Sequence, residues 1–346
     1  MDRLCHFHEW SESQHRAYTA ASQAHAAYLE ALEQRRQMYG GMHWKTIKGR
    51  QYLYRYRDRG GHGQSLGPRS PDTDRLFAAY VQERAELAER LQALRRQLAE
   101  EVRFCRAALL RRVPSLVAKI LGHPAPLDPA GQGFLALGAA AIHAYEFAAG
   151  AFIAGPGPGG RGATESGLTL AATRPAPPAA LLAWLQKADR SFQALSGETL
   201  QARNRRGFLV TVLTPGGESP RRPKPAANGA AGRLPPEAGS LHYLLSSPRF
   251  TQVVIAKDGT PFKLAAPDPR AFALHHLYLS RQEARPEFQR QQDLSQALAV
   301  AGLVLRYLPQ YYFFSAELRL FPPEIIRQAG KSPETDEFGP ALDIEY

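Results

Sequence analysis

The 346-residue chain contains only two cysteines, Cys5 and Cys105, which lie far apart in the sequence. Their spacing matches no metal-binding or redox motif, and so few cysteines fit a reducing compartment better than a disulfide framework. No apolar run approaches the roughly 18 residues that a membrane span needs, and the N-terminus lacks the charged-then-apolar pattern of a signal peptide. We therefore expect a cytoplasmic protein with no membrane association.

Acidic residues are scarce in the middle of the chain. Between residues 129 and 257 the only aspartate is Asp189, which falls in a predicted helix. The whole chain has 43 basic and 32 acidic residues, a formal charge of +11. Residues 44–69 hold seven basic side chains and one acid, whereas residues 331–346 hold five acids and one lysine. A basic surface of this kind favours a polyanionic partner, most often DNA or RNA.

The first 125 residues predict an N-terminal module of long helices and a small sheet. Residues 11–38 are rich in alanine and contain no proline, which favours a helix, and the leucine spacing over 75–112 predicts a second, longer one. Asp72 or Asp74 is the expected cap of the second helix. Between them, alternation over residues 43–67 predicts a three-stranded antiparallel sheet.

The rest of the chain predicts an α/β (α+β) core over residues 126–265, a helical part over 266–330 and an acidic tail over 331–346. Segments 155–162 and 216–239 are rich in Gly and Pro and predict loops. The predicted strands are 134–137, 168–172, 208–213, 251–255 and 261–264. The predicted helices are 139–150, 178–189, 269–283 and 290–307.

Three segments of this core carry a resemblance to a known fold. They are 134–145 (FLALGAAAIHAY), 164–171 (TESGLTLA) and 205–215 (RRGFLVTVLTP). Their order resembles the core of the nucleotidyltransferase fold of the DNA polymerase β-like superfamily, and in particular one bacterial branch of it. The resemblance covers about residues 45–308 and implies a mixed sheet with a nucleotide pocket at one edge.

In that superfamily the three segments carry a Gly-Ser or Gly-Gly turn, an Asp-x-Asp pair and a third Asp, which together hold magnesium ions and the nucleotide phosphates. The matching positions here are Gly138 with Ala139, Gly167 with Thr169, and Thr211. Glycine has no side chain and a threonine hydroxyl is a weak, neutral ligand for magnesium. The resemblance therefore implies a catalytically inactive relative, for which no cofactor is expected.

An active enzyme is the alternative. Glu165 is the nearest acid and is a candidate substitute ligand; the cofactor would then be magnesium, and the reaction nucleotide transfer to RNA or protein. By the same resemblance, His276 and Arg281 are candidate contacts to a nucleotide or phosphate, with His276 at the position where the family usually has lysine. Arg205 is a further candidate for such a contact, because it belongs to the basic cluster 203–206 that precedes the predicted strand 208–213. The alternative for this cluster is a solvated turn.

A second candidate site lies in the predicted small sheet, where aromatic and basic side chains interleave. Cations contact phosphates, and exposed aromatic rings stack on bases. The residues concerned are Trp44, Lys45, Lys48, Arg50, Tyr52, Tyr54, Arg55, Tyr56, Arg57 and Arg59. A small sheet of this kind resembles the arm-binding domains of phage integrases, which insert a three-stranded sheet into the major groove of DNA. Alternatively, the tyrosines pack on helix 75–112 and the arginines are only solvated.

Three functional hypotheses follow. The first is a non-catalytic nucleotidyltransferase-fold protein that binds nucleic acid (DNA or RNA) or regulates a partner, with the acidic tail lying over the basic module. The second is the active enzyme described above. The third is a structural subunit of a complex, with a protein partner or a second copy of the chain bound through helix 75–112.

Overall fold

The computed structural model describes residues 6–38, 41–56, 63–110, 113–122, 133–154, 167–174, 176–195, 200–213, 241, 244–313 and 318. The chain divides into two compact units, a smaller one over residues 16–109 and a larger one formed by residues 1–15 and 110–346. Each combines helices with β-strands, so the predicted mixed α/β class is confirmed. Among the described helices, none is long and apolar enough to cross a membrane.

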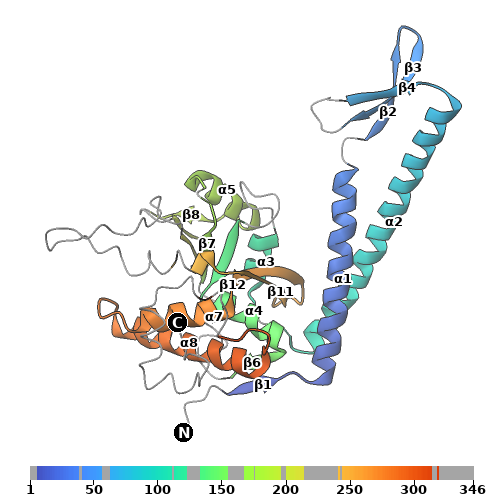
Figure 1. Ribbon diagram of the computed structural model, residues 1–346. Coiled ribbons are helices and arrows are strands. Elements are labelled where there is room, and N and C mark those ends of the chain that lie inside the picture. Colours follow the sequence, from blue (N-terminus) through green and yellow to red (C-terminus); the bar gives the residue numbers. More distant parts are fainter. Residues whose placement is uncertain are drawn as a thin grey trace. The chain divides into compact units, whose positions relative to one another are not determined.

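The smaller unit is an antiparallel pair of long helices with a small sheet at its tip (Figure 1). Helix α1 spans Glu12–Gln37 and helix α2 spans Pro71–Ala107. Ala31 packs against Leu87 and Leu91 in a buried cluster between the helices, and Cys105 Sγ lies 3.7 Å from the backbone oxygen of Ala17. Small residues on α1 allow the leucines of α2 to approach closely, which is how an alanine-rich helix gains a partner.

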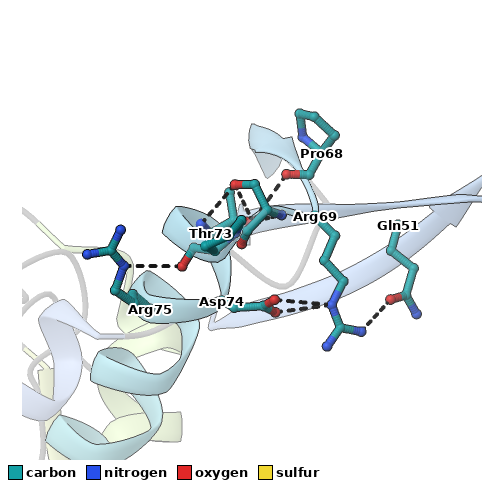
Figure 2. A network of polar contacts seen from close by, with 8 residues as sticks. Gln51, Pro68, Arg69, Thr73, Asp74 and Arg75 are labelled. Atoms are coloured by element: carbon teal, nitrogen blue, oxygen red, sulfur yellow. Dashed lines mark hydrogen bonds and ion pairs between the residues drawn. The ribbon is translucent and has the colours of Figure 1, made fainter.

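Helix α2 begins at a capping box rather than at the predicted aspartates. Ser70 is the N-cap: its Oγ accepts a hydrogen bond from the backbone N–H of Thr73, and Thr73 Oγ1 accepts one from the backbone N–H of Ser70. Asp74 lies in the first turn and binds Arg69 at 3.1 Å, while Arg69 also donates to Gln51 on the sheet (Figure 2). These contacts tie the sheet to the start of α2.

The sheet itself has three antiparallel strands in the order β2–β3–β4, as predicted from the alternation. Lys48 and Gly49 form the two-residue turn between β2 and β3, both with positive φ, as the twist of a tight hairpin requires. The strands are β2 Met42–Ile47, β3 Arg50–Tyr56 and β4 Gly63–Pro68.

The larger unit contains a five-stranded mixed sheet in the order β5–β7–β10–β9–β8. Strand β7 runs antiparallel to β5 and parallel to β10, and the remaining pairs are antiparallel. The strands are β5 Phe134–Leu137, β7 Gly167–Ala172, β8 Gln193–Ala194, β9 Leu200–Arg203 and β10 Leu209–Leu213. The three predicted strands of the resemblance are therefore neighbours in one sheet.

Helices and a second strand pair surround this sheet. The hairpin of β11 and β12 lies beside β5, α4 packs against β5 and the hairpin, and α7 packs against α8. The elements are α3 Ser115–Gly122, α4 Ala139–Ala149, α5 Pro178–Ala188, β11 Arg249–Ile255, β12 Pro261–Pro267, α7 Pro269–Ser280 and α8 Glu287–Tyr307. A short pair, β1 Phe7–Glu9 with β6 Ala151–Ile153, attaches the N-terminal segment to this unit.

The predicted elements lie close to the observed ones, with four omissions. Strands β1, β6, β8 and β9 were not predicted, and each is only two to four residues long. Helix α2 begins at Pro71 and not at residue 75, because Ser70 and not an aspartate caps it, and it ends at Ala107, five residues before the predicted end. The two predicted loops and the acidic tail lie outside the described residues, as does any contact of that tail with the basic module.

Candidate functional site

The positions that the sequence resemblance assigns to a catalytic motif meet at one edge of the five-stranded sheet. Strand β5 ends beside the start of β7, with Leu137 opposite Thr169, and Gly138 follows directly. Thr169 also pairs in register with Thr211 on the parallel strand β10. Gly167 and Thr169 are two residues apart and therefore lie on the same face as Thr211. The predicted constellation is thus brought together, with both threonines only half-buried.

Gly167 occupies a position where the backbones approach closely. A Cβ atom added there would lie 2.7 Å from the backbone oxygen of Leu209, its in-register partner on β10. Any side chain at this position would require one of the two strands to shift. Gly138 is different: its φ is +58°, which favours glycine, but a Cβ atom there would meet nothing within 4 Å.

The donor set at this edge does not fit magnesium. Thr169 and Thr211 offer neutral hydroxyls and Gly167 offers no side chain, whereas magnesium binds carboxylates and phosphate oxygens in preference. Within the parts of the chain that the structure describes, no group of three His, Cys, Asp or Glu side chains could hold a metal ion. Glu165, the candidate substitute ligand, lies outside those parts.

A turn of fixed geometry lies at the same edge, between β9 and β10. Asp189, at the end of α5, accepts hydrogen bonds from the backbone N–H and the hydroxyl of Ser191 and from the side-chain amide of Asn204. These bonds, chiefly those from Ser191, hold the pKa of Asp189 below its usual value. The buried Asn204 in turn accepts from the backbone N–H groups of Arg206 and Phe208. Arg205, a predicted phosphate contact, is exposed on this turn.

His276 and Arg281, the other predicted phosphate contacts, lie on α7. His276 is buried, stacks on Phe272 and makes a 2.8 Å hydrogen bond through Nδ1 to Asp293 on α8. The second oxygen of Asp293 lies 3.1 Å from Nε of Arg285. His276 therefore already has a carboxylate partner that joins α7 to α8. Arg281 caps the end of α7 and is half-buried; contact of either residue with phosphate stays a prediction.

The arrangement of β5, α4, β7 and β10, with a glycine turn after the first strand and paired positions on the next two, defines a nucleotidyltransferase-type sheet. The chain belongs to a nucleotidyltransferase family: the family's sequence profile, described as Nucleotidyltransferase, matches residues 116–318, more than half of the chain. The search of curated proteins and the search of solved structures each returned no match. Family membership accounts for the fold of the larger unit.

The second candidate site, on the small sheet, has two different faces. On one face Tyr52, Tyr54 and Tyr56 alternate along β3, opposite Lys45 and His43 of β2. The rings of Tyr54 and Tyr56 stack with centroids 6.2 Å apart, and Lys45 Nζ lies 5.6 Å from the centre of the Tyr54 ring. We call this the open face; with the turn residue Lys48 and with Arg50 it comprises Lys45, Lys48, Arg50, Tyr52, Tyr54 and Tyr56.

The opposite face is used for packing. Leu53 is fully buried and pairs directly with Trp44, whose ring makes an edge contact with Phe77 of α2 and lies under the guanidinium of Arg69. Arg55 lies on the same face as Leu53, two residues farther along β3. Leu53 and Trp44 therefore hold the sheet on α2, which leaves Tyr52 and Tyr54 half-exposed on the other side.

Sequence patterns alone grouped these ten residues into one patch, and the structure divides them. A cavity of about 570 Å³ lies below the sheet, lined among others by Arg55, Tyr56, Tyr80, Glu83 and Arg90. Arg55 thus faces a mixed-charge cavity and not the open face, while Tyr56 borders both. Arg57 and Arg59 lie outside the described residues.

Proposed function

We propose that this protein is a non-catalytic member of its nucleotidyltransferase family and binds nucleic acid through the open face of the small sheet. The observation that carries the proposal is the separation of the two faces. An apolar contact anchors the sheet through Leu53 and Trp44, so that half-exposed tyrosines and three cations on the other side are available to a partner.

The chemistry of the open face fits nucleic acid. Base stacking on an aromatic ring contributes about 1–3 kcal/mol per base, and lysine and arginine beside the rings neutralise phosphates. The lack of catalysis in this proposal rests on a separate argument: Gly167, Thr169 and Thr211 supply no carboxylate, and position 167 leaves no room for one.

The experiment is a titration of labelled single-stranded and duplex oligonucleotides of equal length, in RNA and DNA, followed by fluorescence anisotropy. Tyr54→Ala should weaken binding about 5- to 150-fold, the equivalent of 1–3 kcal/mol. Lys45→Ala with Arg50→Ala should weaken it and also flatten the dependence of affinity on salt.

The matched control removes two exposed cations elsewhere on α2, Arg96→Ala with Arg103→Ala. The control should bind as the wild type does. Wild-type protein that binds none of the oligonucleotides at low salt, or open-face variants that bind like the control, would refute the binding half of the proposal. Incorporation of labelled nucleotide in the presence of magnesium or manganese, abolished by Glu165→Ala, would refute the non-catalytic half.

A further inference from the structure

The turn between β9 and β10 carries a second concentration of positive charge, separate from the open face. Residues 187–206 contain five basic and two acidic side chains. Arg203, Arg205 and Arg206 are all exposed, and none of the three forms an ion pair with another described residue. This cluster belongs to the larger unit, whereas the open face belongs to the smaller one.

The backbone of this turn is fixed by buried polar groups. Asn204 is 5 % exposed, and its side chain both donates to Asp189 at 3.0 Å and accepts from the N–H groups of Arg206 and Phe208 at 3.0 and 2.8 Å. Ser191 Oγ accepts the N–H of Arg205 at 3.2 Å. The directions in which the arginines leave the backbone are therefore set before any ligand arrives, which lowers the entropy lost on binding.

Within the described part of the chain, Asp189 forms no ion pair with any of the three arginines. The charge of Asp189 attracts Arg206, but both its carboxylate oxygens already accept hydrogen bonds, from Ser191 and from Asn204. Asp189 thus stabilises the conformation of the turn, and the three arginines remain exposed to solvent.

We propose that Arg203, Arg205 and Arg206, the arginine turn, form a second binding site of this protein, whose ligand is the phosphodiester backbone of a nucleic acid. Guanidinium groups make paired hydrogen bonds to phosphate oxygens. Exposed cations on the end of a hairpin suit an extended backbone, which offers a phosphate to each of them in succession. A free nucleotide offers the same phosphate chemistry but needs walls that hold its base, so the experiment includes both sources. The site goes beyond the proposed function, because it lies in the other unit and uses other residues.

The test uses the full chain and a labelled single-stranded oligonucleotide, with affinity measured over a range of salt concentrations. Arg205→Ala with Arg206→Ala should weaken binding several-fold and lower the slope of log affinity against log salt by about 1.4, or roughly 0.7 per lost contact. The control, Arg174→Ala with Lys263→Ala, removes two exposed cations of the same unit, of which Arg174 follows the opposite end of β7. The control should leave both quantities unchanged.

The outcomes separate this site from the open face. If Lys45→Ala with Arg50→Ala weakens binding and the arginine-turn variant does not, the arginine turn is refuted and the proposed function stands. If only the arginine-turn variant weakens binding, the turn is supported and the role of the open face fails. A nucleoside triphosphate without metal is then added as a competitor. If it displaces the oligonucleotide from the wild type, and this displacement depends on Arg205, then free nucleotide is the ligand and the proposal is overturned.

Discussion

A Cβ atom on Gly167 would lie 2.7 Å from the backbone oxygen of Leu209 on the neighbouring strand. Contacts this short do not occur between unstrained atoms, so the present pairing of β7 with β10 leaves no room for a side chain at position 167.

The first prediction follows from that contact. Gly167→Ala should lower the free energy of unfolding by about 1–3 kcal/mol, because β7 or β10 must shift to admit the methyl group. The matched control is Gly122→Ala at the end of α3, where an added Cβ meets nothing within 4 Å. Urea unfolding of both variants checks the prediction, and equal midpoints for the two variants would contradict it.

The second prediction concerns the two threonines. Thr169 and Thr211 are in-register partners on parallel strands, on one half-exposed face. Adjacent strands are about 4.8 Å apart, close enough for two carboxylates to share a metal ion. Thr169→Asp with Thr211→Asp should lower the melting temperature without metal, through repulsion of like charges, and manganese should raise it again.

At a free metal concentration ten times the dissociation constant, this recovery corresponds to about 1.4 kcal/mol. The wild type, titrated with the same metal, is the control and should show no comparable shift. If manganese does not change the melting temperature of the double variant, the two positions do not face a common site.

The third prediction distinguishes the faces of the small sheet. Leu53 is fully buried and pairs with Trp44, which contacts Phe77 of α2, so Leu53→Ala should lower the free energy of unfolding by about 2–5 kcal/mol. Ile47→Ala, at the exposed end of β2, is the control and should cost far less. Tyr54→Ala should resemble the control in stability while losing affinity for nucleic acid. A loss of stability at Tyr54 as large as that at Leu53 would assign the tyrosines to packing instead.

Much of this architecture could be predicted from the sequence, because the long elements carry strong periodic signals. The alternation around Tyr52 and Tyr54 predicted strand β3, and the glycine turn followed by small residues at Gly138 predicted the start of α4. The family match over residues 116–318 agrees with the order of the core segments. The positions that the resemblance assigns to the family's motif lie in or directly after predicted strands, and the structure places those strands side by side.

The sequence could not show which side chains, distant along the chain, contact one another in the fold. The role of Asp189 depends on Asn204, fifteen residues away and across a turn, and no local pattern links them. His276 and Asp293 meet only because α7 and α8 pack together. The division of the basic segment into two faces also required the pairing register of β2 and β3. Basic residues lie on both faces of β3, with Arg50 on the side of the tyrosines and Arg55 on the side of Leu53, so their alternation does not show which face is open.

The fourth prediction concerns the start of α2. Ser70 caps the helix and exchanges hydrogen bonds with Thr73, so Ser70→Ala should lower the free energy of unfolding by about 0.5–2 kcal/mol. Asp72→Ala is the control, because this acid is exposed and its ion pair is with the exposed Arg75 one turn on; it should cost about 0.5 kcal/mol or less. Hydrogen exchange in the first turn of α2 measures the local effect. Equal protection in the two variants would argue against the capping box.

The last prediction is a pH dependence of stability that originates at His275. Its ring is buried on α7, and burial, together with the neighbouring His276 and Arg285, holds its pKa well below the usual value. In the unfolded chain the same group takes up a proton near pH 6.5. The unfolded state therefore binds more protons as the pH falls below about 7, and stability should decrease by up to about 1.4 kcal/mol per pH unit from this group alone. His275→Leu removes the titrating group, so its unfolding free energy should change less steeply between pH 7.5 and pH 5. Urea unfolding across that range measures both slopes, and identical slopes would show that His275 is protonated in the folded protein.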